Sequence, residues 1–171
     1  MLRRNIFSLS AITALGLALL TSSAFAQTKS LKDQLVGTWN VISVTVTQKN
    51  GNKLDPFGAD SKGILIFTSD GHFALINTRA GLPKFASDNR MLGTADENKA
   101  ITQGTLAYFG TYTVDETGKT YTTHIDRSNF PNDDGSDQKR TITVLTADEL
   151  HFSNPQGTVG GAAEVVAKRV M

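Results

Sequence analysis

The sequence predicts an all-β protein, an eight-stranded up-and-down antiparallel β-barrel with a short N-terminal helix and one surface helix. Eight runs rich in β-branched and aromatic residues are each bounded by Gly, Asp, Asn or Pro. Most successive runs are joined by short turns, so each strand is expected to pair with its neighbour in sequence. A barrel of such strands leaves no open edge, whereas a β-sandwich of the same strands remains the alternative.

The N-terminal segment is expected to lie outside this fold. Arg3 and Arg4 are followed by the apolar run 6–20 and by Ala-Phe-Ala at 24–26, the pattern of a secretory signal with its cleavage site. A membrane anchor is the rival interpretation, but the run is short for a span of about 20 residues. The prediction is a cleaved signal over 1–26 and one domain over 27–171, periplasmic or secreted, with no stable membrane anchor after cleavage.

The composition limits the kinds of site and partner that this domain is expected to have. Removing 26 of the 171 residues leaves 145, enough for one domain with a sizeable core. Cysteine is absent, which excludes disulfides and a thiol nucleophile. The formal charge of +1 includes Arg3 and Arg4, so the domain carries about −1 and gives no reason to expect nucleic acid as a partner. A monomer or weak dimer is expected.

The elements follow in chain order. A short helix over 30–34 precedes the first and longest strand, which holds the only tryptophan. Asp70-Gly71 between the second and third strands is a hairpin signal, because the tight turn needs a residue that accepts a positive φ. The eight strands are expected over residues 38–47, 63–68, 72–78, 109–115, 119–126, 138–145, 149–153 and 163–170.

One longer helix interrupts the strands. Thr94 is a suitable N-cap and Glu97 stands at the capping-box position, so a helix is expected from Ala95 to about Ala107. Its apolar stripe is modest, which predicts that it lies across the barrel surface or one mouth.

Several segments, taken in order, resemble the bacterial lipocalin-like domain family of the calycin and lipocalin-type barrels. They cover nearly the whole domain, and the ordered set is more specific than Gly37-Thr38-Trp39 alone. The matching segments are 35–39, 56–58, 63–71, 84–86, 107–114, His124, 129–132, Gly135, Gln138 and Arg140.

The resemblance implies an eight-stranded barrel with an internal cavity. It also implies that Trp39 closes one end of the barrel against an arginine of a late strand. Arg140 and Arg169 are both available, and Arg140 is the predicted partner. The sequence departs from the family at Asp133 and Asp134, where Trp and an aliphatic residue are usual. An apolar lip over the cavity is therefore expected to be missing.

The predicted function is the binding of a small, mainly apolar molecule inside the barrel, oriented by a few polar groups. Such groups are expected at the end of the barrel away from Trp39. The predicted ligand-binding residues are His124, Arg79, Tyr108, Asn129 and Phe130. A buried structural role for His124 is the alternative.

Two other functions remain as alternatives to small-molecule binding. An isomerase or cyclase would use the same cavity, with His124 as acid or base. A stress-related structural barrel would have a filled core and no ligand. No cofactor is expected. His72 and His151 lie on other strands than His124, without the spacing of metal ligands, and the acidic residues of the loop 132–137 are interpreted as a solvated turn rather than a calcium site.

Overall fold

The computed structural model describes residues 29–170, so the secretory signal expected over 1–26 lies outside the described residues. Within this range the helical segments are α1 (Leu31–Leu35), η1 (Arg90–Leu92), α2 (Ala95–Gly104) and η2 (Pro131–Asp133). The strands are β1 (Gly37–Gln48), β2 (Lys53–Leu54), β3 (Lys62–Phe67), β4 (His72–Thr78), β5 (Thr105–Asp115), β6 (Thr120–Ser128), β7 (Asp137–Leu145), β8 (Glu149–Gly157) and β9 (Gly161–Arg169).

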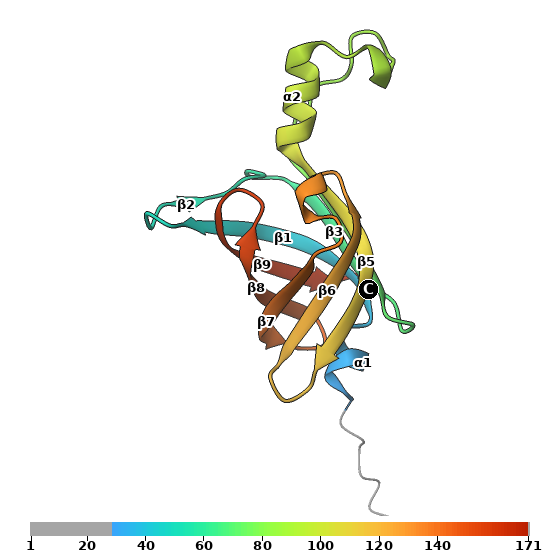
Figure 1. Ribbon diagram of the computed structural model, residues 1–171, viewed down its shortest axis with the longest axis vertical. Coiled ribbons are helices and arrows are strands. Elements are labelled where there is room, and N and C mark those ends of the chain that lie inside the picture. Colours follow the sequence, from blue (N-terminus) through green and yellow to red (C-terminus); the bar gives the residue numbers. More distant parts are fainter. Residues whose placement is uncertain (1–28, 171) are drawn as a thin grey trace, which may run out of the picture.

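The strands form a closed antiparallel barrel, as predicted. Their order is β2-β1-β3-β4-β5-β6-β7-β8-β9, and β1 also pairs with β9, which closes the sheet on itself (Figure 1). The barrel has eight strands because β2 pairs only with the end of β1, through two residues, and extends that strand beyond the barrel wall. Within residues 29–170 no helix has the length and apolarity needed to cross a membrane.

The largest differences from the predicted boundaries lie where α2 passes into β5 and at the end of β8. The helix expected to reach Ala107 ends at Gly104, because the chain from Thr105 pairs with β4, starting at Thr78. Strand β8 continues through Pro155 to Gly157 rather than ending at Ser153. The register of β8 on β9 shifts between Asn154 and Gly157, so the proline occupies an irregular stretch where its missing N–H breaks no regular ladder bond.

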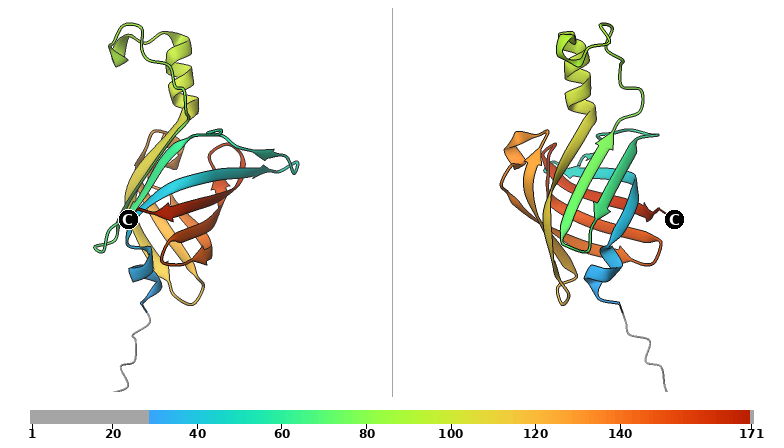
Figure 2. Two further views of the ribbon diagram at one scale, coloured as in Figure 1. Left: turned by 180° about the vertical axis from the view of Figure 1, so that it is seen from behind. Right: turned by 90° about the vertical axis from the view of Figure 1, so that its right-hand side faces the viewer.

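Helix α2 does not lie on the barrel. It projects from the end of the barrel opposite α1, together with the loop that leads into it (Figure 2). This end is called the open end. The capping box is confirmed: the Thr94 hydroxyl accepts from the Glu97 amide at 3.2 Å, and the Glu97 carboxylate accepts from the Thr94 amide at 2.7 Å. The other oxygen of Glu97 accepts from the amide of Ala86 at 2.8 Å. This carboxylate therefore holds the arm, residues 80–103, together.

The arm is expected to loosen in acid before the barrel unfolds. Hydrogen bonds from the Ala86 and Thr94 amides lower the pKa of Glu97 below its ordinary value of 4.5. A lowered pKa in the folded state means that the contribution to stability is present above 4.5 and is lost as the pH falls through the lowered value. Amide hydrogen exchange at Ala86 and Thr94 is expected to accelerate over that range. Glu97→Gln should remove this pH dependence, and unchanged behaviour in that variant would contradict the assignment.

Aromatic side chains fill the lower part of the barrel interior. Phe67 packs edge-on against Tyr112 at 4.9 Å and against Tyr121 at 5.3 Å between ring centroids. Tyr121 in turn packs against Phe152 at 5.5 Å. Edge-to-face pairs of this kind add about 0.5–1.5 kcal/mol each beyond the burial of their area. The core is therefore densest in the half of the barrel next to α1.

Trp39 lies at that end, and its partner is Arg169. The Arg169 guanidinium carbon lies 4.0 Å from the centroid of the Trp39 ring. Arg169 also donates to the backbone carbonyls of Val36 at 2.9 Å and Gln34 at 2.6 Å, which fastens α1 across the opening. The assignment of Arg140 to this closure was wrong, because Arg140 pairs with Tyr121 across β6 and β7 and lies elsewhere in the interior.

Candidate functional site

Arg140 is the centre of a polar cluster inside the barrel. Its strand β7 alternates buried and exposed residues, and this alternation turns Gln138 and Arg140 inward. Arg140 is only 2% exposed. Its Nη2 donates to the Tyr108 hydroxyl at 3.1 Å and to Gln138 Oε1 at 3.0 Å. Its Nη1 donates to the Gln138 carbonyl at 3.0 Å and to the hydroxyl of Thr123.

The electrostatics keep this guanidinium charged. Burial by itself lowers the pKa of Arg140, but the neighbouring Tyr108 and Tyr121, together with the charge of Asp133, outweigh that effect and leave the pKa raised. Both tyrosine rings also lie 5.8 Å from the guanidinium carbon, within range of a cation–π contact. Burial raises the pKa of Tyr121, so its hydroxyl stays neutral.

A small cavity adjoins Arg140. Its volume is about 50 Å³, room for one or two water molecules rather than for a ligand of ordinary size. The polar residues on it are Asn77, Tyr108, Asp133, Gln138, Arg140 and Asn154. The apolar residues that line it include Val44, Val46, Leu75, Phe152, Ala163 and Val165. The interior is thus apolar with one polar corner.

Asp133 is the carboxyl group on this cavity. Burial raises its pKa, while a hydrogen bond from the Gln138 side chain and the charge of Arg140 act in the opposite direction. Gln138 therefore links the two charged residues, since its amide oxygen accepts from Arg140. The segment η2 that carries Asp133 lies at the open end of the barrel, opposite α1 (Figure 1).

Phe57 closes the cavity towards the outside. It is 6% exposed although it belongs to the loop between β2 and β3. The Asp55 carboxylate accepts from the amides of Phe57 at 3.2 Å and Gly58 at 2.8 Å, which folds this loop back. Arg79 donates to the carbonyl of Pro56 at 2.8 Å and fastens the loop to the end of β4. Phe57 thus acts as a plug in the open end.

A larger hollow lies on the other side of Phe57. This outer groove has a volume of about 480 Å³ and is lined by α2, the loop 54–57 and the loop after β6. It shares with the interior cavity the residues Pro56, Phe57, Leu106, Thr158 and Val159. Only these side chains separate the outer groove from the cavity beside Arg140.

Four of the five predicted ligand-binding residues meet at this open end. Arg79, Asn129 and Phe130 line the outer groove, and Tyr108 lines the cavity inside it. Asn129 also has a structural role, because its side chain accepts from the Ala107 amide at 2.8 Å and donates to the Thr105 carbonyl at 2.9 Å. These bonds attach the loop after β6 to the start of β5.

His124 does not join them. Its side chain is about half exposed on the outside of the barrel, where Nδ1 lies 2.8 Å from the Asp137 carboxylate. The prediction placed His124 on the inward face of β6, but the other face of this strand points inward. Tyr121, Thr123 and Ile125 are buried, so the cavity placement of His124 was wrong. Along β6 the large apolar side chains, Tyr121 and Ile125, point into the barrel, and the polar His124 between them points out.

The other titratable residues singled out in the sequence are dispersed. His72 lies 3.2 Å from Asp70, and His151 lies 3.7 Å from Glu149, each on its own strand end. In the loop 132–137, Asp134 accepts from the Ser128 amide while Asp137 faces His124. Within residues 29–170 no three His, Asp or Glu side chains are grouped as metal ligands.

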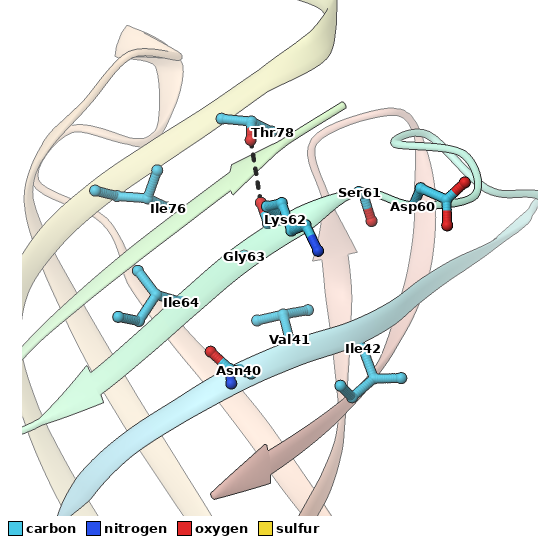
Figure 3. A pocket seen from close by; sticks show the side chains of 10 residues that line it. All are labelled: Asn40, Val41, Ile42, Asp60, Ser61, Lys62, Gly63, Ile64, Ile76 and Thr78. Carbon is cyan, nitrogen blue, oxygen red and sulfur yellow. Dashed lines mark hydrogen bonds between the residues drawn. The ribbon is translucent and has the colours of Figure 1, made fainter. Parts of the chain in front are cut away.

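A further hollow lies on the outer face of the sheet. It covers about 690 Å³ over β1, β3 and β4 and exposes Ile42, Ile64 and Ile76 (Figure 3). The Thr78 hydroxyl donates to the Lys62 carbonyl at 3.2 Å at its edge. The charged side chains that line it, Asp60 and Lys62, are both exposed. It lacks the buried polar cluster found inside the barrel, so the interior is the stronger candidate.

The sequence-based prediction missed Phe57, Gln138 and Asn154 as site residues. Asn154 donates to Gln138 Oε1 at 3.2 Å and so belongs to the cluster around Arg140. A signal for Gln138 and Arg140 was present, since both precede Ile142 at a spacing of two residues on one strand. Phe57 has no such periodic signal.

Known proteins resemble this chain at the level of the family and of the barrel. A family model described as a lipocalin-like domain matches residues 36–168. Among solved structures, a redesigned β-barrel is 15% identical with a TM-score of 0.45, covering 83% of this chain and 96% of that one. A second redesigned β-barrel, bound to DFHBI, is 17% identical with a TM-score of 0.40, covering 82% of this chain and all of that one. No curated protein matches the chain. From the extent of the family match, the chain belongs to the lipocalin-like domain family.

Proposed function

We propose that this protein is exported and binds a small, mainly apolar molecule inside the barrel, through the open end. The observation that carries the proposal is that the interior cavity and the outer groove lie next to each other and share Phe57 as a wall. An apolar wall with a few convergent polar groups is the usual composition of a small-molecule site. The lipocalin-like family supports the same kind of function.

Binding requires Phe57 to move. The cavity of about 50 Å³ is too small for a ligand, while the outer groove of about 480 Å³ lies within the usual size range. Phe57 stands on a loop attached by the Asp55 turn and by one hydrogen bond from Arg79. A rotation of this loop joins the two hollows without disturbing the barrel strands.

Phe57→Ala is expected to strengthen binding of an apolar probe. The substitution removes the plug, so the probe no longer needs to displace it. We expect the dissociation constant of an environment-sensitive naphthalene dye to fall about three- to tenfold, a change of about 0.6–1.4 kcal/mol. Fluorescence titration measures it. The matched control is Phe109→Ala, since Phe109 is a phenylalanine that is 52% exposed on the outside of the barrel. Equal effects of the two substitutions would contradict the role of Phe57.

Native mass spectrometry of the protein from its own compartment tests the proposal as a whole. A retained small molecule supports binding and gives its class. N-terminal sequencing of the same sample tests export, with Gln27 as the expected first residue. A wholly apo mass, together with no thermal shift across a panel of apolar compounds, would overturn the binding function.

The filled structural barrel is the second candidate. The observation that favours it is the same small cavity beside an interior packed with aromatic rings. It predicts that Phe57→Ala lowers stability and creates no binding. The isomerase alternative required His124 and a second polar group at one cavity, and His124 lies outside the barrel wall.

A further inference from the structure

Arg140 is a buried cation without an anionic partner in contact. Its four hydrogen bonds end on two hydroxyls, a backbone carbonyl and an amide oxygen, all of them neutral. Among residues 29–170 no carboxylate lies within 4.0 Å of its nitrogens. Charged groups that are removed from water are normally paired, because their desolvation is costly.

The polar corner offers an anion one free hydroxyl donor beside a buried positive charge. Nη2 of Arg140 bonds the Tyr108 hydroxyl through the oxygen, so this hydroxyl keeps its own proton available to another acceptor. Tyr108 itself lies on the cavity and is 9% exposed. The four Nη–H groups of Arg140 are already used, so a bound carboxylate would accept from the Tyr108 hydroxyl and be held by the charge of the adjacent guanidinium.

We propose that the ligand carries a carboxylate, seated against Arg140 and Tyr108, with an apolar tail that leaves through the open end into the outer groove. This inference rests on the proposed function and specifies its ligand. The small cavity favours a planar carboxylate over a bulkier phosphate. The apolar side chains of Leu106, Phe130 and Val159 in the outer groove suit the tail.

The charge of Asp133 limits how tightly this site can bind a carboxylate. It lies on the same cavity and acts on Arg140 across Gln138. Its ionised form opposes a bound carboxylate, so Asp133→Asn is expected to tighten acid binding several-fold. If Asp133 is instead the counter-charge that Arg140 requires, Asp133→Asn weakens the fold and leaves acid binding unchanged or weaker, which contradicts the proposal.

The test compares three probes of equal chain length, namely decanoic acid, decanol and methyl decanoate. The full domain is expected to bind the acid at least about tenfold more tightly than the other two by isothermal titration. Tyr108→Phe should reduce this preference to about threefold or less while keeping the affinity for decanol. Arg140→Met should abolish the preference, and Arg127→Ala, an exposed arginine next to the same end of β6, should retain it.

The outcomes separate the two proposals. Equal affinities for the acid, the alcohol and the ester overturn the carboxylate assignment and leave the apolar binding function standing. Binding of none of the three overturns both. Circular dichroism checks that Arg140→Met is folded. If it is not, Tyr108→Phe decides alone, because it removes one hydroxyl from a ring whose packing it keeps, and an unchanged acid preference in that variant overturns the proposal.

Discussion

Trp39→Ala is expected to lower the free energy of unfolding by about 3–5 kcal/mol, the range of large-to-small substitutions at buried aromatic residues. Trp39 has no exposed surface. Its indole N–H donates to the Leu35 carbonyl at 2.8 Å, and the Arg169 guanidinium stacks on its ring. The substitution leaves a cavity, an unpaired carbonyl and an uncovered cation at the closed end.

Urea unfolding followed by far-ultraviolet circular dichroism measures this loss, because the variant has no tryptophan fluorescence. Ile42→Ala on the same strand is the control. Ile42 is 52% exposed on the outer face, so its replacement should cost less than about 1 kcal/mol. Losses of the same size in both variants would show that Trp39 does not hold the closed end.

Arg140→Ala is expected to have a comparable effect, a loss of about 3–5 kcal/mol. Truncation empties the space of a long buried side chain and removes the donors from Thr123, Tyr108 and Gln138. Arg140→Met keeps much of the apolar volume and loses only the donors, so its cost should be smaller, about 1–3 kcal/mol. The difference between the free energies of unfolding of the two variants measures how much the packing of the Arg140 side chain contributes to stability.

The control for Arg140 is Arg127→Ala. The Arg127 side chain is 74% exposed; it makes a long ion pair of 3.7 Å with Asp134 and donates to the carbonyl of its neighbour Asp126 at 2.9 Å. Its replacement should change the free energy of unfolding by no more than about 0.5 kcal/mol. Thermal unfolding of the three variants at one pH compares them directly. If Arg140→Ala is as stable as Arg127→Ala, the interior cluster contributes nothing to the fold.

The architecture could be predicted because it follows from local patterns. Alternating apolar residues and turns such as Asp70-Gly71 specify strands that pair with their sequence neighbours. The pairing of β1 with β9 is different, since it joins the two ends of the domain. The register that sets Trp39 opposite Arg169 arises only on closure, and the sequence therefore left two arginines as partners.

The candidate site was predictable in part for the same reason. The loop after β6 brings Asn129 and Phe130 to the outer groove at the open end of the barrel. The error at His124 came from weighting its chemistry over the apolar Tyr121 and Ile125 on the opposite face, a signal that the sequence did contain. Phe57 was beyond prediction, since its burial depends on how the loop after β2 folds over a barrel formed by other segments.

The arm that carries α2 leaves the barrel at Arg79 and returns at Gly104, where the Arg79 amide donates to the Gly104 carbonyl at 2.7 Å. Below this point β4 and β5 are paired from Thr78–Thr105 down to His72–Thr111. A cut by a protease within the arm would thus leave two fragments that share two seams of paired strands, β4 with β5 and β1 with β9. The molecule is divisible at this position, and the two halves should reassemble as a split protein.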